Sequence, residues 1–246
     1  EVNRARQLDH PSARACLKFI KLDKSVSIQY DCDLPSRSGL GSSSTFTVGL
    51  LNALYGLKGE MVTKRQLALN AIHVEQNLIG ESVGSQDQTA AAFGGFNRIE
   101  FGGTNEITVY PITINQDRIH NLQNHLMIFF TGFSRDASTI AAEQIKLTHQ
   151  KNNELNTMKQ MVYEAQNILD SKKDIDDFGK LLHESWQLKR GLSSQISNSA
   201  IDQINNAGRQ AGALGGKLLV AGGGGFILFF VKPEIQPKVK ERLKKF

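Results

Sequence analysis

The sequence has little cysteine and no long apolar run. Its two cysteines, Cys16 and Cys32, form no disulfide framework, and they are expected to be buried, reduced thiols. The longest apolar run ends the stretch GGGGFILFFV and is far shorter than a membrane span. No secretory signal pattern is recognisable. The expectation is therefore a cytoplasmic protein without a membrane partner.

Charge of one sign and metal-binding side chains are also sparse. The formal net charge is only +5, and the basic residues are spread along the chain. Such an excess suits small anionic molecules, and no helix-turn-helix, arginine-rich arm or RNA-binding aromatic signature favours nucleic acid. The six histidines are scattered, without HExxH or CxxC motifs. A metal held by protein ligands alone is therefore not expected.

Apolar residues make up 40% of the 246 positions, which is enough for a sizeable core. Periodicity predicts strands over residues 24–35, 96–101, 106–112 and 125–132, and two strands around the glycines within 215–231. It predicts helices from about residue 46, after Thr63 as N-cap, and over 84–95, 137–168, 175–191, 198–212 and the C-terminal stretch. Residues 1–115 mix strands with helices, whereas residues 116–246 are helix-rich and end in a hairpin and a helix. This order indicates two halves of the α+β class.

A glycine- and serine-rich stretch, PSRSGLGSSST at residues 35–45, precedes the first of these helices. Gly39 and Gly41 allow positive φ and a close approach of the backbone to a ligand. The hydroxyl run would occupy the first helical turn, where backbone N–H groups lack helical partners and the helix dipole is positive. Two interpretations are open at this point: a phosphate cradle and an ordinary serine N-cap. The stretch lacks the GK[ST] ending of a Walker loop and the third glycine of a dinucleotide fingerprint.

Two carboxylates are candidates for chemistry. Asp87, in GSQDQ, has small polar neighbours that leave room for a ligand, and it could orient or deprotonate a hydroxyl. Taken alone, it is better interpreted as a residue that helps to cap the following helix. Glu75 lies at the edge of an apolar stripe formed by Leu67, Ala71, Val74 and Leu78, and it reads as an ordinary surface residue unless its helix faces the glycine-serine loop.

Two further features invite a ligand or a structural explanation. The four glycines 222–225 are entropically costly, and they suggest a backbone that passes close to another segment. A tight bulged hairpin is the alternative. Arg135 follows a strand and could hold an anionic group bidentately, although Asp136 beside it reads as a helix cap.

Taken together, these stretches resemble the GHMP kinases, the superfamily of galactokinase, homoserine kinase and mevalonate kinase. PSRSGLGSSST looks like the phosphate-loop signature of the family, and GGKLLVAGGGGF looks like its C-terminal glycine signature. GSQDQTAAAFGG stands where the family places its catalytic aspartate. The stretches HVEQNLIGESVGSQDQTAAAFGGFNRIEF, FFTGFSRDAS and HESWQLKRGLSS look most like the heptose 7-phosphate kinases of this superfamily.

The resemblance implies a role for each matching position. Asp87 would act on the sugar hydroxyl, Ser43 and Glu75 would ligate Mg2+, and Arg135 would join Gly222, Gly223 and Gly224 at the substrate. Arg37, Lys189 and Arg190 are further candidates for contacts with the sugar phosphate. The ATP phosphates would be bound by the loop residues Pro35, Ser38, Gly39, Leu40, Gly41, Ser42, Ser43 and Ser44.

The implied fold is a two-domain GHMP kinase. Its N-terminal half resembles ribosomal protein S5 domain 2, its C-terminal half is ferredoxin-like, and the active site lies between them. The implied activity is ATP-dependent phosphorylation of the anomeric hydroxyl of D-glycero-D-manno-heptose 7-phosphate, for nucleotide-activated heptose. Alternatives are another sugar such as fucose, or an inactive protein that binds nucleotide or sugar phosphate. The first family signature is absent and the chain opens at EVNRARQ, so the N-terminal domain is expected to be partial.

Overall fold

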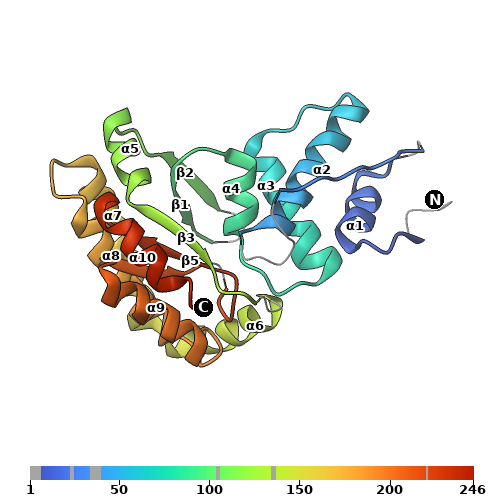
Figure 1. Cartoon of the computed structure of the whole chain (residues 1–246). Helices are drawn as coiled ribbons and strands as arrows, with labels where there is room; N and C mark the ends of the chain where they lie inside the picture. The colour runs from blue at the N-terminus through green and yellow to red at the C-terminus, as the bar shows by residue number, and fades with distance from the viewer. Residues whose placement is uncertain (1–6, 23–24, 34–39, 104–105, 134–136, 220) are drawn as a thin grey trace. The chain divides into compact units, whose positions relative to one another are not determined.

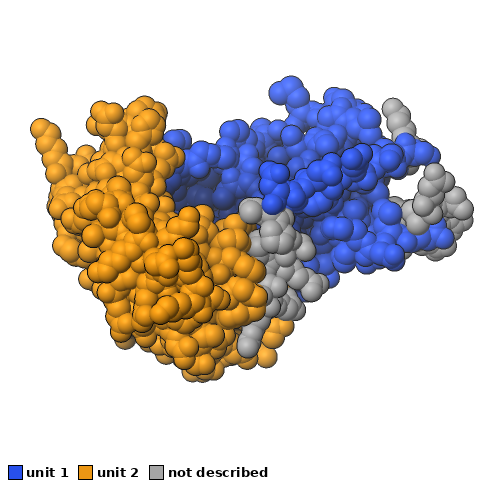
Figure 2. All heavy atoms as spheres, viewed as in Figure 1, with its two compact units in different colours: residues 1–36, 41–111 blue, residues 37–40, 112–246 orange. Residues whose placement is uncertain are grey.

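The computed structural model describes residues 7–22, 25–33, 40–103, 106–133, 137–219 and 221–246. The chain divides into two compact units (Figure 2), residues 1–36 with 41–111, and residues 37–40 with 112–246. The division expected at residue 115 stays a prediction of domain organisation. Four predicted site residues, Pro35, Ser38, Gly39 and Arg135, lie outside the described residues, as does Arg37.

The first unit is a group of helices with a small hairpin (Figure 1). Strands β1 (Asn97–Phe101) and β2 (Ile107–Pro111) pair antiparallel, with Ile99 opposite Val109. Helix α2 contacts both α1 and α4, and α3 also packs against α4, so α4 is held by two neighbours. The helical elements are α1 (Pro11–Ile20), α2 (Ser42–Lys58), α3 (Lys64–His73), the π-helix η2 (Val74–Ile79) and α4 (Gln86–Phe93).

Of two local predictions for this unit, a helix cap is confirmed and a strand is not. The Thr63 hydroxyl accepts a hydrogen bond from the Gln66 N–H at 3.1 Å and caps α3. The strand predicted over residues 24–35 is wrong for the described residues 25–33, which hold no regular element. Alternation alone does not make a strand, because its backbone groups need a neighbouring ladder. In the described part of the chain, β1 and β2 pair with each other and not with this segment.

The second unit is built on a three-stranded antiparallel sheet in the order β3-β5-β4 (Figure 1). Its strands are β3 (Leu126–Phe130), β4 (Gly215–Leu218) and β5 (Phe226–Phe230), so the predicted glycine-linked pair is confirmed. Helices α8 and α9 contact β4. The helices are α5 (Gln116–Asn124), α6 (Ala137–Leu147), α7 (Asn152–Asp170), α8 (Asp176–Arg190), α9 (Ser199–Ala211) and α10 (Gln236–Leu243), with short 3-10 turns η3 (Thr148–Gln150) and η4 (Pro233–Ile235).

The single long helix predicted over residues 137–168 is wrong, because η3 separates α6 from α7. The Thr148 hydroxyl donates back to the carbonyl of Gln144 at 2.9 Å, a contact that competes with regular helix geometry. The Asn152 side chain then donates to the His149 carbonyl at 3.3 Å. The break between α6 and α7 therefore coincides with two local side-chain hydrogen bonds, which apolar spacing does not reveal.

Each unit has its own apolar core. In the first unit, the buried side chains Cys16, Leu51, Leu54 and Val74 belong to one cluster. In the second, Trp186 is fully buried in a cluster that spans the sheet and α6, α8, α9 and α10. The described residues thus confirm the α+β class. None of the helices found in them has both the length and the apolarity to span a bilayer.

Candidate functional site

Helix α2 begins at a glycine rather than at a capping serine. Gly41 occupies the N-cap position with φ of 72°, in the left-handed region that favours glycine. No side chain of the described residues caps this end. The first intrahelical bond runs from the Thr45 N–H to the Gly41 carbonyl at 2.9 Å. The N–H groups of the first turn are therefore left for another acceptor, which favours the anion-cradle interpretation over the N-cap one.

A π-helical segment turns Glu75 into the interior of the first unit. Beyond His73 the chain winds as η2, and the Gly80 N–H bonds to the Glu75 carbonyl, five residues back, at 3.1 Å. Glu75 is 1% exposed, whereas Leu78 is 41% exposed. The sequence predicted the opposite arrangement. The wider winding of η2 shifts the side chains that follow Glu75, Leu78 among them, around the helix axis. Single π-turns of this kind are common at functional sites.

Two neutral donors meet one oxygen of the buried Glu75 carboxylate. The Ser44 hydroxyl donates to Glu75 Oε2 at 2.8 Å, and the Gln88 amide donates to the same oxygen. Ser44 and Gln88 are buried as well, at 6% and 1% exposure. The other oxygen, Glu75 Oε1, is buried and has no hydrogen-bond partner among the described residues. This network joins α2, η2 and α4, three elements of one unit.

Asp87 lies directly against the start of α2. A Cβ added at Gly41 would stand 3.3 Å from Asp87 Cγ and 3.4 Å from Oδ2. Asp87 is half-buried in the first turn of α4, where a carboxylate is favoured by the helix dipole. A carboxylate therefore lies beside the N-terminus of a helix, an arrangement that can hold an acceptor hydroxyl close to a bound anion.

The donor set fits a divalent cation only in part. A buried, unpartnered carboxylate oxygen is an acceptor that a bound cation would satisfy, and Mg2+ prefers oxygen ligands. The described residues hold no group of three His, Cys, Asp or Glu side chains suited to a metal. Mg2+ bound through one or two protein oxygens plus substrate phosphates is consistent with both observations.

Cys16 lies close enough to this carboxylate to respond to its charge. Burial, and secondly the charge of Glu75, raise the pKa of the Cys16 thiol to about 12. The thiol is therefore protonated at neutral pH and unreactive as a nucleophile. The expectation of a buried thiol holds for Cys16, but Cys32 is exposed.

The four-glycine run is explained in part by close packing inside the second unit. Gly223 donates its N–H to the Ile196 carbonyl at 2.9 Å, and Gly225 donates to the Phe133 carbonyl at 2.9 Å. A Cβ at Gly222 or Gly224 would come within 2.8 Å of one of these carbonyl oxygens. Side chains are therefore excluded at Gly222 and Gly224 on steric grounds. The roles of Gly222, Gly223 and Gly224 toward a substrate stay predictions.

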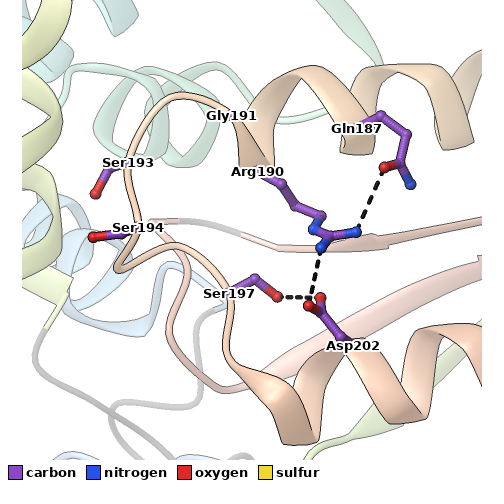
Figure 3. A pocket seen from close by; sticks show the side chains of 7 residues that line it. All are labelled: Gln187, Arg190, Gly191, Ser193, Ser194, Ser197 and Asp202. Carbon is purple, nitrogen blue, oxygen red and sulfur yellow. Dashed lines mark hydrogen bonds and ion pairs between the residues drawn. The ribbon is translucent and has the colours of Figure 1, made fainter.

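A polar pocket of about 420 Å³ lies beside the α8–α9 connection of the second unit. Figure 3 shows Arg190 reaching Asp202, whose other oxygen accepts from Ser197. The Arg190–Asp202 distance is 2.9 Å. Lys189 is 9% exposed and donates to the Leu218 carbonyl at 3.1 Å. Both cations already have protein partners, which weakens their case as phosphate ligands.

The structure thus brings together Gly41, Ser44, Glu75 and Asp87. Ser43, predicted as a metal ligand, is exposed, and the serine that meets Glu75 is Ser44. Leu40 is half-buried and belongs to the second unit, and Ser42 is half-buried in the first turn of α2. The role of Gln88 was missed, although its place directly after Asp87 in SQDQ was a usable signal.

Two family models match the chain. The model for the GHMP kinases N terminal domain matches residues 11–95, and the model for the GHMP kinases C terminal matches residues 161–246. The first covers the described candidate site, with Gly41, Glu75 and Asp87. The second covers the glycine loop and the polar pocket of Figure 3.

Named relatives agree with these models. A D-glycero-alpha-D-manno-heptose 7-phosphate kinase from Campylobacter jejuni is 32% identical over 229 residues, which is 92% of this chain and 67% of that protein. A bifunctional fucokinase/GDP-fucose pyrophosphorylase from Arabidopsis thaliana is 27% identical, over 90% of this chain and 21% of its own length.

A crystal structure described as a D-glycero-D-manno-heptose 1-phosphate kinase from Bacteroides thetaiotaomicron superposes with a TM-score of 0.75 at 27% identity, covering 96% of this chain and 67% of that one. The chain therefore spans about two thirds of the length of either heptose kinase. The likeness extends through both units, so the predicted two-domain fold is confirmed.

Proposed function

Since the chain belongs to the GHMP kinase family, whose members are phosphotransferases with an alcohol group as acceptor, we propose that it is a heptose phosphate kinase. The proposed reaction transfers the γ-phosphoryl group of ATP to the anomeric hydroxyl of D-glycero-D-manno-heptose 7-phosphate and gives the 1,7-bisphosphate. The product would serve the synthesis of nucleotide-activated heptose for surface glycans.

The observation that carries the proposal is the placement of Asp87 against the glycine start of α2. In-line transfer needs an acceptor hydroxyl beside the phosphoryl group, and its rate depends mainly on positioning and charge neutralisation. The uncapped N-terminus of α2 would bind phosphate oxygens, with the hydroxyls of Ser42 and Ser43 in the same turn. Asp87 would accept the proton of the sugar hydroxyl, or orient it, as attack begins.

Glu75 Oε1 and the serine hydroxyls of the first turn are the oxygens proposed to hold Mg2+ together with the ATP phosphates. Bound there, Mg2+ would neutralise charge that develops on the transferring phosphoryl group. Arg135 and the glycines 222–224 are proposed as substrate contacts. We also propose Pro35, Ser38, Gly39 and Leu40 as the remaining phosphate-loop contacts.

A second sugar substrate has support of its own. The similarity to a plant fucokinase extends over 90% of the chain, although at lower identity. The names of the two heptose kinases also place the phosphate group of the substrate differently. One name gives a heptose 7-phosphate and the other a heptose 1-phosphate. The substrates tested must therefore differ both in the sugar and in the position of its phosphate group.

The test is release of ADP by the protein expressed from its complete gene, with Mg-ATP and one candidate acceptor at a time. The acceptors are the mannose-configured heptose 7-phosphate, its 1-phosphate, the unphosphorylated heptose, fucose and galactose. We expect turnover with the 7-phosphate, and a loss of about 10²- to 10⁴-fold in Asp87→Asn because a general base is removed.

Turnover with fucose or with the 1-phosphate would replace the proposed substrate and keep the kinase. Binding of ATP without turnover on any sugar would leave a nucleotide-binding protein without kinase activity. An Asp87→Asn variant with undiminished turnover would overturn the role of Asp87.

A further inference from the structure

We propose that Gln88 is a positioning residue for the metal–nucleotide complex. Its side-chain amide holds the Glu75 carboxylate so that one oxygen, Oε1, stays available for the metal. The inference rests on the proposed function, because it concerns the site where Mg-ATP would bind. It assigns to Gln88 a task that is separate from that of Asp87, its neighbour on α4.

The first step is the polarity of the contact. An ionised carboxylate only accepts hydrogen bonds, so the Gln88 amide must present its NH2 group to Glu75. The Gln88 Nε2 atom donates to Glu75 Oε2, and both side chains are 1% exposed. The amide therefore has one usable orientation in this site, and its carbonyl oxygen points elsewhere, buried and unpartnered among the described residues.

The second step is the distribution of donors on the carboxylate. Ser44 and Gln88 both donate to Oε2, and neither donates to Oε1. A charge buried to this degree is costly unless it is compensated, and two neutral donors on one oxygen compensate it only in part. The remaining acceptor capacity is concentrated on Oε1. A cation is the partner that would complete such a site.

The third step is the geometry of the support. Ser44 comes from the first turn of α2 and Gln88 from the first turn of α4, so the two donors approach the carboxylate from different elements. The carboxylate is thereby held from two sides. Partners that orient a metal ligand in this way usually affect metal affinity by about 10- to 100-fold when removed.

The test compares Gln88→Met with a matched control. Methionine keeps the length and approximate volume of glutamine but has no N–H donor. The control is Thr89→Val, because Thr89 is fully buried on the same helix and its hydroxyl donates only to the Ser85 carbonyl, at 2.7 Å. Each variant loses one side-chain hydrogen bond, and only Gln88→Met loses a bond to Glu75.

The measurement is Mn2+ binding with ADP present, followed by the electron paramagnetic resonance signal of free Mn2+, in the protein expressed from its complete gene. We expect Gln88→Met to weaken Mn2+ binding by about 10-fold or more. Thr89→Val should bind Mn2+ as the unaltered protein does. Gln88→Met should lose more thermal stability than Thr89→Val, because it takes a donor from a buried carboxylate. A purely structural role for Gln88 would lower the melting temperature and leave the Mn2+ affinity unchanged.

Two results would overturn the inference, and they are distinguishable. Equal Mn2+ affinity in Gln88→Met and the unaltered protein would remove the positioning role and leave the proposed function intact. Failure of the unaltered protein to bind Mn2+ with ADP would overturn the proposed function and this inference together. If Gln88→Met does not fold, Gln88→Asn withdraws the amide by one methylene and should weaken Mn2+ binding in the same direction; unchanged binding there would count against the role.

Discussion

At the scale of single residues, Gly41 meets two separate requirements. Its φ of 72° needs a residue without a Cβ, and the space where a Cβ would stand is bounded by Asp87. Gly59, at the other end of α2, has a similar φ of 74° but nothing within 4 Å. A substitution at Gly59 would therefore cause backbone strain alone, whereas one at Gly41 would cause the same strain and also a contact with Asp87.

We expect Gly41→Ala and Gly59→Ala to destabilise the protein by a similar amount, about 1–2 kcal/mol, because both place a Cβ in the left-handed region. Urea unfolding measures this change. Only Gly41→Ala should also weaken ADP binding and sugar phosphorylation, since it alone displaces Asp87. Equal functional loss in both variants would show that Gly41 acts through the stability of α2 rather than at the site.

Cys16 provides a pH-dependent prediction. Its pKa is raised from the model-peptide value of 9.0 to about 12, so the folded state keeps a proton that the unfolded state releases. The stabilisation is fully present below pH 9 and is lost as pH rises toward 12.

The free energy of unfolding should therefore decline more steeply above pH 9 in the unaltered protein than in Cys16→Ala, as measured by urea titration at several pH values. Parallel pH profiles for the two proteins would contradict the burial effect. Thiol labelling at pH 8 should modify Cys32 alone until urea is added, since Cys32 is the exposed cysteine.

At the scale of elements, glycines within helices have opposite consequences in the two units. Gly49 lies in the middle of α2, and a Cβ there would meet nothing within 4 Å. Gly208 lies in α9 against the sheet, and a Cβ there would stand 2.5 Å from Phe229 Cε1. One glycine is therefore a helix weakness, and the other is required by packing.

We expect Gly49→Ala to stabilise the protein by about 0.5–1 kcal/mol, because alanine restricts the unfolded chain and suits a helix. Gly208→Ala should destabilise it by about 1–3 kcal/mol through overpacking against Phe229, although the propensity gain is the same. The melting temperatures of the two variants, compared with that of the unaltered protein, test both expectations. A stabilised Gly208→Ala would mean that Phe229 can move aside.

The elements also show how far sequence reasoning reaches. Thr63 marks the start of α3 because its cap acts locally, and the pairing of β4 with β5 follows from two apolar runs joined by glycines. The burial of Glu75 does not follow, because the sequence places it at the edge of an apolar stripe and the contacts that enclose it come from α2 and α4. For the same reason the contact of Ser44, rather than Ser43, with Glu75 requires the structure.

At the scale of the whole molecule, the two units have separate cores. Among the described residues, the clusters around Cys16 and around Trp186 share no side chain. Trp186 is the single tryptophan and is fully buried in the second unit, so its fluorescence reports that unit alone. Exposure of the Cys16 thiol reports the first unit in the same way.

We expect two distinct urea midpoints, one from Trp186 fluorescence and one from Cys16 labelling in a Cys32→Ser background, because each core can be lost without the other. ADP with Mg2+ should raise the Cys16 midpoint, since Glu75 and Asp87 lie in that unit. Coincident midpoints under all conditions would show that the molecule unfolds as one cooperative unit.

The π winding of η2 also determines which kind of genetic change the site tolerates least. A π-turn holds one residue more than the α-turn that it replaces, and each residue of an α-helix turns the chain by about 100°. Loss of one codon within residues 76–79 would return the segment to α-helical winding. A substitution there keeps the number of residues in the turn, whereas such a deletion would rotate the chain that follows, and α4 with Gln88, relative to the carboxylate of Glu75. Single-codon deletions in this segment should therefore be rarer among functional alleles than amino-acid replacements.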